Sequence, residues 1–278
     1  MLQPGKFNYL QIVQEQAFGV YLDGGQEFGK ILLPRKYVPK GFKIDDWLDV
    51  FVYYDSEDRL IATTRKPYAQ VGEFAHLKIV DVNNVGAFAD WGLEKDLLIP
   101  FQEQIKRLET GRSYTVRIYR DRSTGRLNGS TKIDKFLRPI NQGKFEAGQK
   151  VNIMVWRKTE IGYSAIIENS HVGMLYNNEI FQPLRYGNKL TAQIKQIRED
   201  DRIDLSLNKK ARDQYQELPD KILAFLKDND GVSTLTDKSS PEDIYKTFAV
   251  SKSNYKKALG RLYKERKIKL SAERIEIL

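Results

Sequence analysis

Hydrophobic and polar residues alternate with a period of two along much of the first 210 residues. Tyr114, Val116 and Ile118 alternate with more polar neighbours, and residues 151–156 repeat the pattern. This alternation is typical of half-buried β-strands. Several short strands with glycine, asparagine and aspartate turn signals in each stretch of about 65–75 residues predict small β-barrels.

Three copies of one sequence pattern divide this β region. Glycines with apolar or aromatic neighbours occur at positions 19, 86 and 162, and each is followed at a fixed distance by an arginine and an apolar residue. These arginines are Arg59, Arg126 and Arg202. A constant spacing within each copy indicates an internal repeat. We expect each copy to run strand, glycine-marked strand, short strand, irregular connection and closing hairpin, with the glycine allowing a tight bend.

The sequence after residue 210 changes to a helical period. Residues 222–226 carry an apolar helical face, and Ser240 followed by Pro241 is a strong helix start. Ser251 is expected to cap a further helix, after which residues 268–270 and 275–278 alternate as two short strands. A helix, a helix-turn-helix and a hairpin in this order predict a winged-helix domain.

Composition narrows the chemistry that the chain can perform. The 278 residues are 41% hydrophobic and 11% aromatic, as expected for a protein with a folded core. The absence of cysteine excludes disulfides, thiolate zinc sites and cysteine nucleophiles. The two histidines, His76 and His171, are far apart in sequence and argue against a histidine-rich metal site or a Ser-His-Asp triad. The sequence contains no Walker, Rossmann or nucleophile-elbow motif.

Two acidic clusters, residues 45–49 and 200–204, are the remaining candidates for a catalytic Mg²⁺ site. Aspartate is also favoured in hairpin turns for backbone reasons, which is the preferred interpretation of Asp200 and Asp201. We therefore expect a protein that is not an enzyme and that has no metal or cofactor. No apolar run approaches the ~18–20 residues of a membrane span, and no secretory signal is recognisable, so a cytoplasmic protein without membrane contact is expected.

The positive charge of the chain is spread over most of its length. The net charge is +9, which divides as 0 for residues 1–66 and +3 each for residues 67–138, 139–210 and 211–278. The windows 112–138 and 251–270 are densest, with eight basic residues each. Such a balance is typical of an ordinary basic surface or of an electrostatic footprint for nucleic acid.

The repeats resemble the S1 RNA-binding domain, a barrel of the oligonucleotide-binding (OB) class. The third copy carries the closest resemblance in residues 173–179 and in its closing hairpin, residues 200–207, whereas the second has the clearest Gly-Ala-Phe strand at residues 86–88. Three such barrels followed by a winged helix resemble the bacterial conserved virulence factor B family. The resemblance implies an RNA-binding regulator that acts after transcription.

The fold predicted in this way is mainly β with an α+β C-terminus. It consists of three tandem S1-like, five-stranded OB barrels at residues 1–66, 67–140 and 145–210, followed by a winged-helix domain at residues 211–278.

The resemblance also implies an RNA-binding face of two aromatics, a histidine position and an Asp/Arg pair in each barrel. The histidine position holds Pro34, Pro100 and Tyr176, and the aspartate is kept only as Asp55. These departures favour binding mainly through the nucleic-acid backbone over stringent recognition of bases. Together with the basic window, the candidates are Phe18, Tyr21, Arg59, Phe88, Arg117, Tyr119, Arg122, Arg126, Tyr163, Tyr176, Arg202 and Lys209.

The winged helix adds a second set of candidate contacts on its presumed recognition helix. These are Lys252, Lys256, Lys257, Arg261 and Lys264. Lysine contacts phosphate well and reads base edges less specifically, so RNA, DNA and protein partners stay open for this helix.

Structural interpretations compete with several of these candidates. Tyr21 and Phe88 are also expected in a barrel core, and the recurring arginines are also expected as solvated hairpin residues. The first copy, with no net charge, is compatible with a purely structural role or with a brace between domains.

The sequence favours the first of three functions and leaves the other two as alternatives. The first is a non-enzymatic protein that clamps single-stranded RNA along the second and third barrels. The second is a transcription regulator that binds duplex DNA through the winged helix. The third is a protein-interaction adaptor on the ribosome or the transcription machinery.

Overall fold

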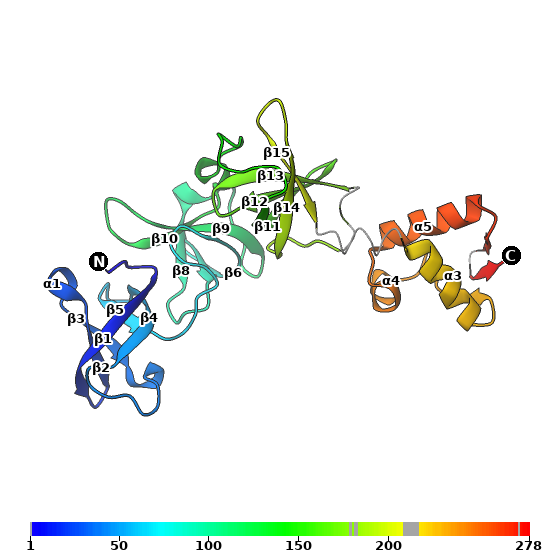
Figure 1. Ribbon diagram of the computed structural model, residues 1–278. Coiled ribbons are helices and arrows are strands. Elements are labelled where there is room, and N and C mark those ends of the chain that lie inside the picture. Colours follow the sequence, from blue (N-terminus) through cyan, green and yellow to red (C-terminus); the bar gives the residue numbers. More distant parts are fainter. Residues whose placement is uncertain (1, 178–179, 181–182, 208–216, 272) are drawn as a thin grey trace. The chain divides into compact units, whose positions relative to one another are not determined.

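The computed structural model describes residues 2–177, 180, 183–207, 217–271 and 273–278, coloured along the sequence in Figure 1. The chain divides into two compact units, Met1–Leu137 and Arg138–Leu278. The first unit contains two β-barrels, and the second contains a third barrel and a helical domain. The mainly β fold with a winged helix at its C-terminus is therefore confirmed.

The first barrel is closed and follows the expected element order. Its strands are β1 (Phe7–Gln16), β2 (Gly19–Asp23), β3 (Lys30–Pro34), β4 (Trp47–Tyr54) and β5 (Leu60–Thr63), hydrogen-bonded in the order β1-β2-β3-β5-β4. Two short helical turns, α1 (Gly25–Phe28) and η1 (Arg35–Tyr37), lie in its connections. Strands β4 and β5 form the closing hairpin, whose turn carries Arg59.

The second barrel is closed by side-chain packing along one seam. Its strands are β6 (Phe74–Val82), β7 (Gly86–Asp90), β8 (Leu97–Pro100), β9 (Ser113–Arg120) and β10 (Leu127–Ser130), with hydrogen bonds in the order β10-β9-β6-β7-β8. The short helices η2 (Phe101–Glu103) and η3 (Ile133–Phe136) follow β8 and β10. At Gly129 of β10 a Cβ atom would lie 2.8 Å from the side chain of Ile99 of β8. The glycine therefore lets β10 pack closely against β8 across the seam.

The third barrel repeats the closed topology of the first. It contains β11 (Lys150–Lys158), β12 (Gly162–Ile167), β13 (His171–Tyr176), β14 (Lys189–Ile197) and β15 (Ile203–Leu207), in the order β11-β12-β13-β15-β14. Alternate residues of these strands, such as Ile153, Ala165 and Leu205, fill one core. The alternation of the sequence predicts this inner face correctly.

The repeated glycines let two neighbouring strands approach each other closely. Gly19, Gly86 and Gly162 each pair with the last residue of the next strand, where an added Cβ atom would lie 1.9–2.5 Å from a backbone carbonyl oxygen. The first strand of each barrel carries a register shift, which is the signature of a β-bulge. Close approach of two strands therefore explains the glycine, and the tight bend expected there stays a prediction.

Strand β4 is buried on both faces and joins the first two barrels. Val50 and Val52 belong to the core of the first barrel. Phe51 and Tyr53 point the other way and belong to the core of the second barrel, together with Trp91. Strand β4 is thus the brace between domains that the sequence of the neutral first copy allows.

The C-terminal domain has the predicted winged-helix elements. Its helices are α3 (Leu218–Asp228), α4 (Pro241–Phe248) and α5 (Lys252–Lys264), and its small sheet has the order β16 (Val232–Ser233), β18 (Ile275–Ile277), β17 (Ile268–Leu270). The hydroxyls of Ser240 and Ser251 cap α4 and α5 by accepting hydrogen bonds from backbone N–H groups, as expected. Among the described residues, no helix is long and apolar enough to cross a membrane.

Candidate nucleic-acid interface

The second barrel carries five of the twelve barrel candidates that the sequence suggests. On β7, Ala87 and Ala89 face the core, so Phe88 between them faces outward, opposite Leu98 of β8. On the neighbouring strands β10 and β9, Asn128 pairs with Tyr119. These positions form one surface, which we call the outer sheet and define by β7, β8, β10 and β9.

The outer sheet continues onto the helix η3. The rings of Tyr119 and Phe136 lie 6.1 Å apart, and the ammonium group of Lys135 lies 5.7 Å from the first ring and 4.8 Å from the second. Burial raises the pKa of the Tyr119 hydroxyl above its usual value, and the nearby carboxylate of Glu103 adds to the shift. Rings and a cation lie side by side here, which is the arrangement of a stacking platform for bases.

Arg117 is held within the barrel surface. Its guanidinium lies 4.6 Å from the ring centroid of Phe74 and 5.4 Å from that of Phe136, and its side chain is half-buried. Burial lowers the pKa of this guanidinium from its usual value. The geometry indicates that Arg117 helps to fix η3 against the strands.

The turn between β9 and β10 presents Arg122 to solvent. The carboxylate of Asp121 accepts hydrogen bonds from the backbone N–H and the hydroxyl of both Ser123 and Thr124. These donors lower the pKa of Asp121 to about 2. The turn is thereby held in one shape beside the exposed side chain of Arg122.

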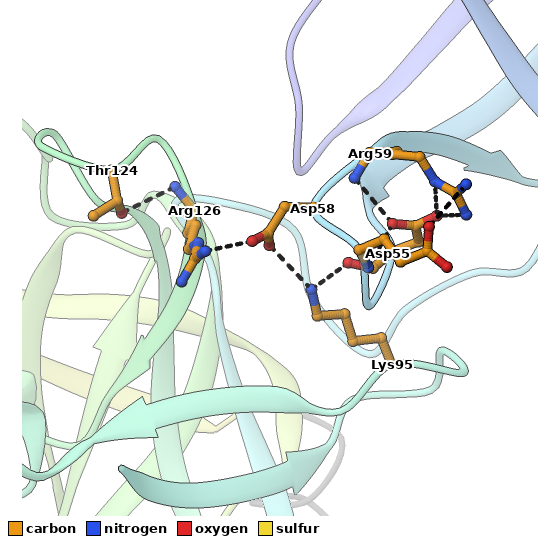
Figure 2. Close-up of polar contacts among 7 residues, drawn as sticks. Asp55, Asp58, Arg59, Lys95, Thr124 and Arg126 are labelled. Atoms are coloured by element: carbon orange, nitrogen blue, oxygen red, sulfur yellow. Dashed lines mark hydrogen bonds and ion pairs between the residues drawn. The ribbon is translucent and has the colours of Figure 1, made fainter.

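Arg126 is paired with the first barrel. Figure 2 shows its guanidinium on the carboxylate of Asp58, which also lies 3.6 Å from the ammonium group of Lys95. Arg59, the equivalent arginine of the first barrel, pairs with Asp55 and with Glu57 in its own hairpin. The same repeat position therefore carries a local ion pair in one barrel and a bridge between barrels in the next.

The first barrel places both aromatic residues that the resemblance implies outside its core, Phe18 exposed and Tyr21 half-buried. Phe18 lies in the turn before β2 and is 55% exposed, and its ring meets that of Tyr21 edge-on at 6.2 Å. Tyr21 faces away from the core formed by Val20 and Leu22. Arg59, the basic residue of the repeat pattern in this barrel, is paired with Asp55 and Glu57 of its own hairpin.

The third barrel places one implied residue inward. Tyr163 packs against the barrel core, because it alternates with Ser164 and so shares a strand face with Ala165 and Ile167. Its assignment to an exposed face is therefore corrected. Lys209 lies outside the described residues.

Tyr176 of β13 has a cationic partner that the sequence candidates do not include. The guanidinium of Arg198 lies 5.4 Å from its ring centroid and donates to the buried carboxylate of Asp204 at 2.8 Å. Arg202 instead is 66% exposed and pairs with Asp200. Sequence reasoning missed Arg198 because it occupies the position expected for the aspartate.

The helix α5 presents a basic face. Lys256, Lys257, Arg261 and Lys264 are exposed, whereas Lys252 is half-buried and donates to the carbonyl oxygen of Lys238. Two of these charges have acidic partners, since Lys256 lies 3.5 Å from Asp237 and Arg261 lies 2.8 Å from Glu265.

Comparisons with known proteins agree with this architecture. Residues 220–277 match the CvfB-like winged helix domain, and residues 4–65 match the S1 domain. The chain is 24% identical to conserved virulence factor B of Staphylococcus epidermidis, over 98% of this chain and 94% of that protein. The chain is therefore similar to conserved virulence factor B along nearly its whole length, and its C-terminal domain matches the CvfB-like winged helix.

Two other proteins are similar to this chain along almost their whole length. An uncharacterized protein of Bacillus subtilis, YitL, is 27% identical over 96% of this chain and 91% of its own. A crystal structure of a multidomain protein with nucleic acid binding domains from Streptococcus pneumoniae is 26% identical, with a TM-score of 0.45 over 99% of this chain and 98% of that chain. An S1 domain joined to a winged helix indicates a partner that is a nucleic acid.

Proposed function

We propose that the chain is a non-enzymatic RNA-binding protein that regulates gene expression after transcription. In this proposal the outer sheet of the second barrel and the Tyr176–Arg198 pair of the third hold a single strand, and α5 adds contacts to phosphates. The observation that carries the proposal is the outer sheet, on which the rings of Phe88, Tyr119 and Phe136 accompany two exposed cations. These are Arg122 and Lys135, of which Lys135 is paired with Glu103. Single strands are bound by rings that stack on bases and by cations that follow the backbone.

The experiment compares three ligands of equal length on the full chain: single-stranded RNA, single-stranded DNA and duplex DNA. Each affinity is titrated against salt, because phosphate contacts release counterions and give a slope that counts them. The proposal predicts the tightest binding for single-stranded RNA. A preference for duplex DNA would overturn it, and so would the lack of binding to all three at moderate salt, which would favour a protein-interaction adaptor.

A variant of Phe88 tests the outer sheet directly. Phe88→Ala removes the half-buried, outward-facing ring of β7, and we expect single-stranded RNA to bind about 5- to 100-fold more weakly, as for the loss of one stacked base. Ile105→Ala is the matched control, because Ile105 is 66% exposed in the same barrel and lies outside the outer sheet. Equal affinities of the two variants would remove Phe88 from the interface.

A second candidate function is duplex DNA binding through α5. It is favoured by the exposed cations of this helix, above all Lys257 and Lys264. Lys257→Gln with Lys264→Gln should then reduce the salt slope for duplex DNA by about two, one for each lost phosphate contact. The control is Lys227→Gln with Lys246→Gln, which removes two exposed lysines from α3 and α4 of the same domain.

A further inference from the structure

A pocket of about 420 Å³ lies where the hairpin of β4 and β5 faces the outer sheet of the second barrel. Its volume is within the range of sites that bind small ligands, about 300–1,000 Å³. The walls are aromatic and aliphatic from both barrels, with Tyr53 on one side and Phe88, Trp91 and Leu98 on the other. Neither barrel forms this pocket by itself.

The pocket also has polar side chains that suit the edge of a base. Asn128 of β10 and Asp96, which precedes β8, both line it. A carboxamide donates and accepts hydrogen bonds, and a carboxylate accepts them, so the two groups complement the donors and acceptors of a nucleobase. The combination of a flat apolar wall and a few polar groups is typical of a site that orients a planar ligand.

One anion and two cations lie at the margin of this pocket. Asp58, Lys95 and Arg126 all line it, and the carboxylate of Asp58 lies between the two basic groups (Figure 2). Lys95 also donates to the backbone carbonyl oxygen of Asp55. The three charged side chains are 39–59% exposed, so water reaches them, and exposed ion pairs of this kind exchange partners at little cost.

We propose that this pocket binds one nucleotide of single-stranded RNA, with the base against Phe88 and the phosphate in place of the Asp58 carboxylate on Arg126 and Lys95. A phosphate carries its charge on several oxygens and is bound by arginine in a fork, so it competes well for this position. The hairpin of the first barrel thus occupies the phosphate position until RNA binds. This inference rests on the proposed function and names one subsite of it.

The test compares Asp58→Asn with Glu57→Gln in the full chain. Both variants remove one negative charge from the same hairpin, but Glu57 pairs with Arg59 and does not line the pocket. We expect Asp58→Asn to bind a short single-stranded RNA about two- to fivefold more tightly, which corresponds to the release of one exposed ion pair. Glu57→Gln should change the affinity by less than about 1.5-fold, because its charge is screened.

A double-mutant cycle fixes the position of the phosphate. In an Arg126→Gln background the gain from Asp58→Asn should shrink or disappear, since the cation that Asp58 covers is then absent. A gain that persists unchanged, or equal effects of Asp58→Asn and Glu57→Gln, would overturn the pocket while leaving RNA binding in place. If the unaltered chain does not bind single-stranded RNA at all, the proposed function itself is overturned. Thermal unfolding of each variant checks that the two barrels remain folded.

Discussion

The ring of Phe51 meets the ring of Trp91 edge-on, with 5.7 Å between the two centroids. Phe51 lies on the outer face of β4 in the first barrel, and Trp91 follows β7 in the second. Both side chains are at most 3% exposed. The pair therefore belongs to a core that the two barrels share, and this core holds the hairpin with Asp58 beside the outer sheet.

Removal of this contact should destabilise both barrels together. Phe51→Ala is expected to lower the free energy of unfolding by about 3–5 kcal/mol, because it leaves a cavity in a fully buried core. Phe18→Ala, which removes an exposed ring of the same barrel, should cost less than about 1 kcal/mol. Urea denaturation followed by tryptophan fluorescence measures both values. A similar cost for the two variants would mean that the barrels do not share a core.

The grip of the third barrel should depend on Arg198 more than on Arg202. Arg198→Lys keeps a positive charge but loses the planar group over Tyr176, and we expect RNA affinity to fall about 3- to 10-fold. Arg202→Lys keeps the same charge at an exposed hairpin position and should leave the affinity within about twofold. Fluorescence anisotropy with one labelled RNA compares the two variants. A larger loss for Arg202→Lys would restore the prediction made from the sequence.

Local patterns were sufficient to predict the order of the elements. Strand alternation, the spacing from each glycine to its arginine, and the caps at Ser240 and Ser251 depend on residues that are close along the chain or repeated in register. The burial of the outer face of β4 does not depend on such residues. Val50 and Val52 predict one buried face, but Phe51 and Tyr53 are covered by a different barrel, and no local pattern specifies that partner.

The candidate site could be predicted less well for the same reason. Phe88 was predicted from the resemblance of its strand to the S1 domain, and alternation with Ala87 and Ala89 places it on the outer face. The same alternation places Tyr163 in the core. The partners of the charged residues could not be predicted from the sequence, because they depend on tertiary contacts. Arg126 forms an ion pair with Asp58, which belongs to a different repeat. The guanidinium of Arg198 lies over the ring of Tyr176, although Arg198 occupies a sequence position at which an aspartate was expected.

Acid should loosen the turn between β9 and β10 over a defined pH range. The pKa of Asp121 is about 2 in the folded chain, below its ordinary value of 3.8, because four donors favour the charged carboxylate. A carboxyl group whose pKa is lowered by folding stabilises the folded chain at pH values above its pKa in the unfolded chain. This contribution is lost as the pH falls from about 4 to 2. Asp121→Asn should flatten that part of the stability profile. NMR titration of the Asp121 carboxyl measures the pKa, and a midpoint near 3.8 would contradict the hydrogen-bonded turn.

Gly260 should reveal whether α5 lies against a ligand. A Cβ atom built at this position meets no atom of the described residues within 4 Å, so no packing among them explains a glycine in the middle of a helix. Gly260→Ala should therefore raise the free energy of unfolding of the winged-helix domain by about 0.5–1 kcal/mol.

Lys257, Arg261 and Lys264 border a shallow hollow around Gly260, into which a nucleic-acid backbone can come close. We expect the alanine variant to be more stable and to bind nucleic acid about two- to fivefold more weakly, because its methyl group and a phosphate compete for the same space. Greater stability with unchanged affinity would show that the helix face does not need this close approach.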